Sequence, residues 1–430
     1  MTDRTWRLCM LVVVTAALGL RLAYVFFVVG DDGLAGDAIY YSAQAETITR
    51  GTGFAHPFTG EAAADHPPAT AVLLALPSIG GGDPAFEQRI FMAFLGTAAV
   101  LAIALLGREI VRTMSSDPAA VRTGSLIAAS AAALHPGLWI NDGLAMSETP
   151  TAVITALVLV AAIRWRRGDG PAWVLGIAGG LAVLTRAELG LLMAVLVVPW
   201  GLPGPWMKRC RQIAVVTVVA LLVVAPWTVR NLVRFEEPVL VSTNEGLTLR
   251  GANCDPAYFE GVGFWYLQCA GPVDGDQSEV SSEYRRQAID YVGEHLDRVP
   301  AVVAARLARV WSVWEVDAMT HLNQGEGRPP TASWMAVIAW WILAPAAAVA
   351  IVALRRRRGP VLVVLAPFVT VTIVAIATYG IPRFRLPAEV AAIGVLAVVG
   401  AVRSERSGVP ATPTPPLPPP APHESRRDGD

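Results

Sequence analysis

Apolar stretches separated by short charged loops recur along most of this chain of 430 residues. A helix needs about 20 residues to cross the hydrocarbon layer of a bilayer. Ten stretches approach that length: 8–29, 89–106, 123–140, 152–163, 173–184, 189–202, 213–227, 334–354, 361–378 and 386–402. The two on either side of 185–190 are short and could be re-entrant. The pattern predicts an all-α polytopic membrane protein, a bundle of about ten transmembrane helices.

One hydrophilic block interrupts this pattern. Residues 230–330 are the only long polar stretch, enough for a small outward-facing domain that rests on the bundle. Within it, 281–295 and 299–313 have helical periodicity, whereas 239–269 is rich in Gly, Asn and aromatic residues and is typical of short strands and loops. We therefore expect a small mixed domain here.

These features divide the chain into four parts. They are an N-terminal membrane module (1–229) with a first outward loop (30–86), the outward domain (230–330), C-terminal membrane helices (331–403) and a Pro-rich tail (404–430). The tail cannot pack a core, so we expect it to be disordered in the cytoplasm.

Composition supports the membrane assignment. Apolar residues make up 54% of the chain and charged residues only 16%, too few to coat a soluble globule of this size. The net charge of −1 identifies no partner, since the charges are segregated along the chain, and we expect no nucleic acid. Arg21 interrupts the first stretch, which we interpret as a retained anchor; it should pair with a buried carboxylate or carbonyl.

Basic residues cluster in alternate loops, which predicts the orientation. The clusters lie at 4–7, 108–122, 164–167, 208–211 and 355–358. Short loops rich in Lys and Arg stay on the cytoplasmic side of the cell membrane. We therefore expect both termini in the cytoplasm and Asp37, His66, Glu148 and Arg186 on the outer side.

Two of the four cysteines, Cys254 and Cys269, fall in the outward block, where the compartment is oxidising. A disulfide between them would close a small loop and add roughly 3 kcal/mol of stability in the chain-entropy model. Two unpaired thiols are the alternative. A zinc site would need more ligands nearby, and His295 and His321 lie far along the chain.

The polar motif at 36–41, GDAIYY, follows the first apolar stretch and the acidic pair Asp31-Asp32. It puts carboxylates at the outer mouth of the bundle, where one could accept a proton from an incoming hydroxyl. We favour Asp37 as this base; Asp32 or Asp31, and then Asp65, are the alternatives. The structural interpretation is that Asp37 merely caps a helix that begins at Ala38, for about 1 kcal/mol.

More motifs follow in order on the outward side. They are GTGF at 51–54, HPP at 66–68, Glu148, LTR at 184–186, PWTVRN at 226–231, NEG at 244–246 and RFRLP at 383–387. With the motif at 36–41, this set resembles the GT-C fold glycosyltransferases of the bacterial type. These are related to protein O-mannosyltransferases and aminoarabinose transferases, and the chain is similar to glycosyltransferase family 39. The resemblance covers nearly everything except the tail.

The resemblance implies inverting transfer of a hexosyl or pentosyl group from a polyprenyl-phosphate donor to a hydroxyl outside the cytoplasm, on a glycan, lipid or protein. Asp37 would be the general base, and fixed cations would stabilise the leaving phosphate. The substrate-binding residues would be His66, Glu148, Arg186, Arg230, Asn244, Arg383 and Arg385. The abundance of Ala, Val and Arg is typical of a high-GC genome, where mannose or arabinose on decaprenyl phosphate is the natural expectation.

The cations must be arginines, since Lys208 is the only lysine and lies in a predicted cytoplasmic loop. Some relatives hold the lipid phosphate with a lysine beside a Pro-Pro pair. This chain has His66 at that position, and a histidine binds phosphate well only when it is protonated. Guanidinium groups match phosphate oxygens two at a time. Each of these arginines also has a structural alternative. Arg186 could form an ion pair with Glu188. Arg230, and likewise Arg383 and Arg385, could anchor the chain at the lipid headgroups.

We expect no cofactor. Asp31, Asp32 and Asp37 could share a divalent cation, but the resembled branch generally works without one. The main functional alternative is a flippase or transporter of polyprenyl-linked lipid, which should carry ionisable groups near mid-bilayer and broken helices in matching halves. Here the polar residues concentrate at the outer ends. A catalytically inactive cell-envelope assembly protein is the other alternative.

Overall fold

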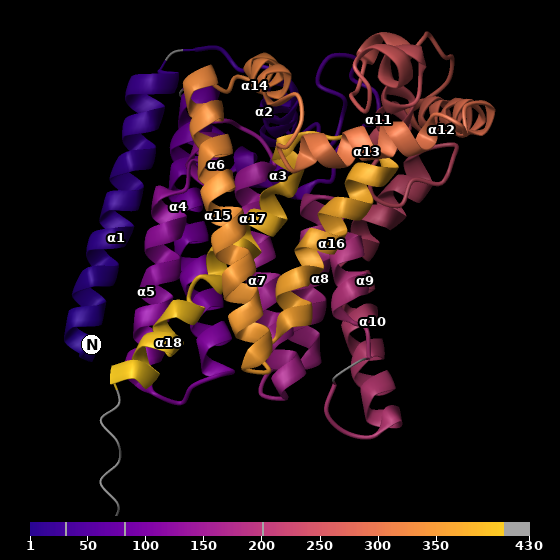
Figure 1. Ribbon diagram of the computed structural model, residues 1–430. Helices are drawn as coiled ribbons and strands as arrows, with labels where there is room; N and C mark the ends of the chain where they lie inside the picture. The colour runs from indigo at the N-terminus through magenta and orange to yellow at the C-terminus, as the bar shows by residue number, and fades with distance from the viewer. Residues whose placement is uncertain (31, 81–82, 200–201, 408–430) are drawn as a thin grey trace, which may run out of the picture.

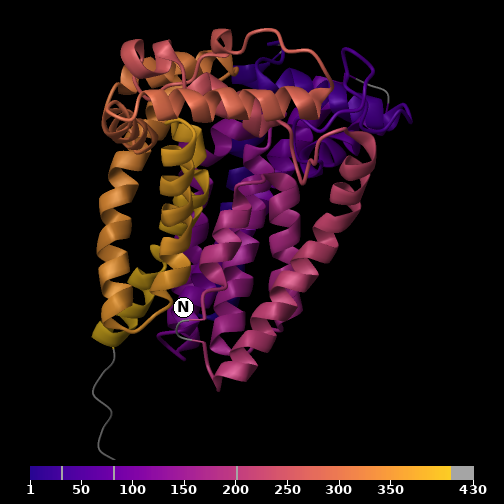
Figure 2. The same cartoon turned by 90° about the vertical axis from the view of Figure 1, so that its right-hand side faces the viewer.

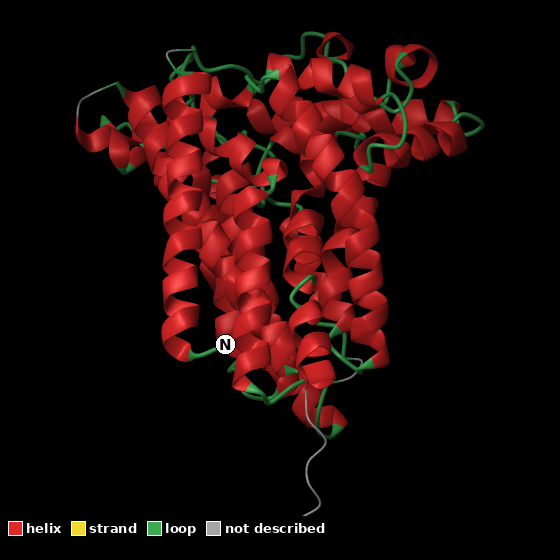
Figure 3. Ribbon diagram, turned by 60° about the vertical axis from the view of Figure 1, so that its left-hand side comes forward, coloured by secondary structure: helices red, strands yellow, loops and turns green. Residues whose placement is uncertain are grey.

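The computed structural model describes residues 1–30, 32–80, 83–199 and 202–407. Upright helices form a bundle, and a layer of helices lies across one of its ends (Figures 1 and 2). Within the described ranges there is no strand, only an isolated bridge between Ala55 and Ala62 (Figure 3). The predicted all-α membrane class is confirmed.

The upright helices alternate in direction along the bundle, except that α18 continues α17 in the same direction. They are α1 (Asp3–Tyr24), continued by the π-helix Val25–Val29, α4 (Pro84–Arg112), α5 (Pro118–Leu134), α7 (Glu148–Arg167), α8 (Ala172–Thr185), α9 (Leu189–Leu196), α10 (Trp206–Arg234), α15 (Pro330–Arg356), α16 (Val361–Ala377), α17 (Leu386–Val395) and α18 (Val398–Ser407). Short helices α3 (Ala69–Ala75) and α6 (Pro136–Trp139) join them near one end.

The transverse layer, called the cap below, contains α2, α11, α12, α13 and α14. Their bounds are Asp37–Thr49, Asn244–Ala252, Gln277–Glu294, Val299–Val310 and Val316–Gly325. Helices α12 and α13 confirm the two periodic segments of the hydrophilic block. The short strands expected at 239–269 are wrong: α11, a π-turn at Pro256–Glu260 and a 3₁₀ turn at Leu267–Cys269 occupy that segment. Cys254 and Cys269 form a disulfide that joins the end of α11 to the 3₁₀ turn.

Six helical segments are long and apolar enough to cross a membrane. They are Asp3–Val29, Pro84–Arg112, Glu148–Arg167, Trp206–Arg234, Pro330–Arg356 and Pro382–Val402. Six of the ten predicted stretches fall within them, and the other four fall on the shorter helices α5, α8, α9 and α16. Helix α5 stops at Leu134 because His135 precedes a proline and takes an extended backbone (φ −72°, ψ 113°).

Helix starts carry strong local signals. Asp83 and Asp117 cap α4 and α5, each followed by a proline at the first helical position. Asp276 and Glu279 form a capping box at the start of α12. These residues explain why the boundaries fall where they do, independently of packing.

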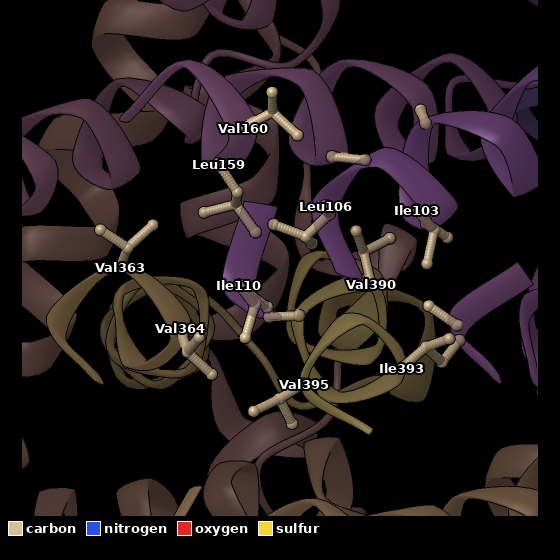
Figure 4. Close-up of a cluster of buried hydrophobic side chains, with 14 of the residues drawn as sticks. Ile103, Leu106, Ile110, Leu159, Val160, Val363, Val364, Val390, Ile393 and Val395 are labelled. Atoms are coloured by element: carbon tan, nitrogen blue, oxygen red, sulfur yellow. The ribbon is translucent and has the colours of Figure 1, made fainter. Parts of the chain in front are cut away.

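The core runs through the middle of the bundle, where α4, α7, α16 and α17 meet (Figure 4). Leu106 of α4, Leu159 of α7 and Ile393 of α17 are almost completely buried. Small residues let the helices approach closely: a side-chain carbon on Gly124 would lie 2.8 Å from the carbonyl oxygen of Ala397. Arg21 is buried and pairs with Asp142 at 2.7 Å, which confirms the carboxylate partner predicted for it.

The two ends of the bundle differ in charge. The basic clusters at 108–122, 164–167, 208–211 and 355–358 all lie at helix ends remote from the cap, at the end where the chain starts (Figure 1). We call this the basic end. The predicted tail begins inside α18, whose helix continues to Ser407, and residues 408–430 lie outside the described residues.

Candidate active site

A cavity of about 610 Å³ opens at the capped end, between the upper ends of α8 and α16 and the cap helices α2, α11 and α12. Five residues proposed from the sequence line it: Asp37, His66, Arg186, Asn244 and Arg383. They come from separate elements, since Asp37 begins α2, Arg186 ends α8, Asn244 begins α11 and Arg383 lies in the 3₁₀ turn Pro382–Arg385. The fold thus gathers most of the predicted site around one space.

Asp37 does not cap its helix, contrary to the structural interpretation. Helix α2 begins at Asp37 itself, and the N-cap position is Gly36, with φ 56° and no side chain to accept a hydrogen bond. The Asp37 carboxylate is therefore free of backbone donors at the helix start. Its Oδ2 accepts a hydrogen bond from Nη1 of Arg383 at 3.1 Å, and 40% of the side chain remains exposed.

Arg383 connects the acidic groups of the site. Its Nη1 lies 3.1 Å from Asp37, 2.7 Å from Oε1 of Glu326 and 3.8 Å from Oε1 of Glu148. Tyr379 also lines the cavity. A single guanidinium group is thus shared among carboxylates at the cavity wall.

Glu148 lies behind the wall. Its side chain is 1% exposed and does not line the cavity, so direct substrate contact by this residue, which the sequence predicted, has no support in the geometry. Instead, its Oε1 faces three guanidinium groups: Arg328 at 3.4 Å, Arg186 at 3.6 Å and Arg383 at 3.8 Å. A buried carboxylate surrounded in this way orients the arginines in front of it.

Arg186 forms the ion pair given as its structural alternative and also lies on the cavity wall. Its Nε donates to Oε1 of Glu188 at 2.5 Å, the structural pair, and the residue also lines the cavity. Its Nη1 reaches Oγ of Ser147 at 3.4 Å. The ion pair therefore holds the guanidinium at the cavity instead of withdrawing it.

Two other predicted residues, Arg230 and Arg385, lie elsewhere. Arg230 donates to the carbonyls of Phe54 and Ala63 at 2.7 and 2.8 Å, which fastens the first outward loop to α10. Arg385 is buried and donates to Oε1 of Glu389 at 2.5 Å. Neither lines the cavity, because their guanidinium groups are used inside the fold.

The alternative bases are also outside the cavity. Asp32 is exposed, and its carbonyl accepts a hydrogen bond from Arg89 at 2.7 Å. Asp65 accepts from the hydroxyl of Tyr40 and from Gln277. Asp31 lies outside the described residues.

Sequence reasoning missed Glu326 and Arg328. They pair with each other, and Arg328 also holds Oδ1 of Asn141 at 3.1 Å. The available signal was the sequence Glu-Gly-Arg directly before the proline-rich start of α15, where Gly327 adopts φ 81°. Such a turn places opposite charges at a helix start, at the level of the cavity.

His66 stacks on Tyr41, with ring centroids 4.5 Å apart. Burial lowers the pKa of His66, and although Asp37 and Asp65 oppose this, the net pKa stays below its usual value. The ring is thus neutral at pH 7, and it provides no fixed positive charge. Burial raises the pKa of Asp37, but the guanidinium groups of Arg383 and Arg186 lower it further, so the carboxylate is ionised.

This protonation pattern predicts a pH effect on stability. Below the ordinary histidine pKa of 6.5, the unfolded chain binds a proton at position 66 that the folded protein does not bind. The free energy of unfolding should therefore decrease as the pH falls from about 6.5 towards 5. His66→Phe keeps a stacked ring but cannot bind a proton, so it should lose this part of the pH dependence of the unfolding free energy. Thermal unfolding of both proteins across this range measures it; identical pH dependence would contradict the assignment.

Comparisons with known proteins identify no family. No family model and no curated protein matches the chain. Two crystal structures of ArnT from Cupriavidus metallidurans are similar to this chain, each at 18% sequence identity. The structure bound to undecaprenyl phosphate has a TM-score of 0.39, and the match covers 94% of this chain and 79% of that chain. The structure in the apo state has a TM-score of 0.38, and the match covers 90% of this chain and 77% of that chain. We assign no residue role from this likeness.

Proposed function

We propose that this protein is a membrane glycosyltransferase of the GT-C type that moves a pentosyl or hexosyl group from a polyprenyl-phosphate donor to a hydroxyl outside the cytoplasm. The observation that carries the proposal is the pairing of Asp37 with Arg383 on the wall of a cavity of about 610 Å³. A proton acceptor and cations suited to a phosphate face the same space. The motif resemblance described above supports the same reaction class.

In this reaction, the acceptor oxygen attacks the anomeric carbon from the side opposite the phosphate. A new carbon–oxygen bond forms, the bond between the anomeric carbon and the phosphate oxygen breaks, and the configuration inverts. The hydroxyl proton passes to the carboxylate of Asp37. The polyprenyl phosphate leaves with the bonding electron pair, and Arg186 and Arg383 stabilise its charge.

The ion pair between Asp37 and Arg383 couples donor binding to base strength. In the free protein, the guanidinium group favours the ionised carboxylate and makes it a weaker base. When phosphate oxygens engage Arg383, part of its charge is compensated and its effect on Asp37 decreases. Asp37 then accepts a proton more readily while the donor is bound.

We infer that the basic end faces the cytoplasm and that the capped end, with the cavity, lies outside. The inference rests on the retention of basic loops on the cytoplasmic side. Both chain termini would then be cytoplasmic. Asn244 on the cavity wall offers an amide to sugar hydroxyls.

Reconstitution of the full-length protein into liposomes tests the proposal. Vesicles would be supplied with polyprenyl-phosphate mannose or polyprenyl-phosphate arabinose and a panel of glycan, lipid and peptide acceptors. We expect release of polyprenyl phosphate together with an inverted glycoside, detected by mass spectrometry and NMR. Movement of intact donor across the bilayer without cleavage would favour the flippase, and donor binding with neither outcome would favour an inactive assembly protein.

A further inference from the structure

A second cavity lies at the basic end of the bundle, away from the candidate active site. Its volume is about 480 Å³, and four helix ends surround it: the start of α1, the end of α4, the start of α5 and the end of α7. Helix α4 has 29 residues and runs from the capped end to this cavity. At 1.5 Å per residue, about 40 Å separates the two places.

Arginine dominates the lining of this second cavity. Four arginines contribute to it, Arg108, Arg112, Arg122 and Arg167, against two aspartates, Asp3 and Asp169. Arg108 and Arg112 are one helical turn apart and therefore lie on the same face of α4. The lining has a positive excess.

The carboxylates near the cavity compensate this excess only in part, since Asp3 pairs with Arg122 at 3.6 Å and Asp169 pairs with Arg167. Glu109 is fully buried and is shared by Arg112 at 3.2 Å, Arg164 at 2.8 Å and Arg167 at 3.1 Å. For Arg108 there is no ion pair or side-chain hydrogen bond within the described ranges. One guanidinium group at the cavity thus has no ion-pair or side-chain hydrogen-bond partner among the described residues.

A second donor at the same cavity is also unused. The indole Nε1 of Trp6 is buried and has no hydrogen-bond partner among the described residues, although a buried N–H group normally has one. Trp6 and Arg108 are both donors, and both line the cavity. A ligand that satisfies them must supply acceptor oxygens and negative charge.

The surroundings identify the source of that ligand. The cavity lies at the level of the helix ends, where lipid headgroups are found, and its lining includes the apolar residues Pro118 and Val121. Above it, α1 exposes Leu8, Leu11 and Val12. A phospholipid could place its phosphate among the arginines while its acyl chains follow this apolar surface.

We propose that the cavity at the basic end binds the phosphate of an anionic phospholipid headgroup. Arg108 and Trp6 donate directly to phosphate oxygens, and Arg112 and Arg122 add positive charge. Binding at this site connects α1 to α4, α5 and α7 and involves no residue of the candidate active site. The proposal therefore stands whether or not the protein transfers a sugar.

Native mass spectrometry of the full-length protein, titrated in neutral detergent with phosphatidylglycerol or phosphatidylcholine, tests the proposal. We expect phosphatidylglycerol to bind about tenfold more tightly than phosphatidylcholine. Arg108→Gln should weaken phosphatidylglycerol binding about tenfold, the size expected for losing a charge-assisted hydrogen bond. Trp6→Phe, which retains the ring and loses the N–H, should weaken it severalfold.

Arg355→Gln is the matched control, since it removes one exposed positive charge at the same end and lies outside the cavity lining. It should leave the affinity unchanged. If Arg108→Gln and Arg355→Gln weakened phosphatidylglycerol binding equally, the effect would come from general surface charge. That result would contradict the proposed site. Displacement of phosphatidylglycerol by inorganic phosphate at the same concentration would also overturn it, because the ligand would then be a soluble anion.

Discussion

Asp37→Asn should reduce sugar transfer by about 10²–10⁴-fold, the usual contribution of a positioned general base. The asparagine side chain has the same shape and can still accept a hydrogen bond from Arg383, so the geometry at 3.1 Å should persist. What it loses is the ability to take the acceptor proton. The measurement is the rate of transfer at saturating donor in reconstituted vesicles.

The variant should fold and bind the donor lipid like the wild type. Asp37 is half-buried, does not cap α2, and leaves Arg186 in place to hold the phosphate. Asp32→Asn is the matched control, because Asp32 is exposed and lies outside the cavity. Full activity of Asp37→Asn would remove Asp37 as the base, and a loss confined to Asp32→Asn would transfer that role to Asp32.

Glu148→Gln should lower the free energy of unfolding by about 3 kcal/mol, in line with the loss of one partner from a buried ion pair. Glu148 is 1% exposed and lies within 4 Å of three guanidinium groups. The glutamine preserves the volume and removes the negative charge that these groups share. Thermal or denaturant unfolding in detergent micelles, monitored by circular dichroism, measures the change.

Glu188→Gln is the control for this prediction. Glu188 pairs with Arg186 at 2.5 Å, but 31% of its side chain is exposed, so water screens the interaction. Its loss should cost less than about 1 kcal/mol. Equal destabilisation by the two variants would show that burial of Glu148 is not the source of its effect.

The helices of this protein follow closely from local patterns. Apolar stretches define the bundle, and aspartates followed by proline define the starts of α4 and α5. The segment 239–269 is the exception, since its Gly and aromatic content indicated strands and the structure has short helices. A disulfide and packing against α12 and α13 stabilise turns there that composition alone cannot specify.

The candidate site was partly predictable. Asp37 and Arg383 stand out because each departs from its surroundings, one as a carboxylate after an apolar stretch and the other as an arginine at an end predicted to be poor in basic residues. Glu326 and Arg328 do not stand out within a hydrophilic block. Their contacts with Arg383 and Glu148 place them at the site.

By itself, the sequence determined the all-helical membrane class, the positions of most helices and the clustering of basic residues in alternate loops. These properties depend on neighbours a few residues apart, through hydropathy, capping and charge. The tertiary structure alone decided which arginines face the cavity, since Arg383 does and Arg230 does not. It also joined Asp37 to an arginine 346 positions away, a contact that depends on how the helices pack rather than on any local pattern.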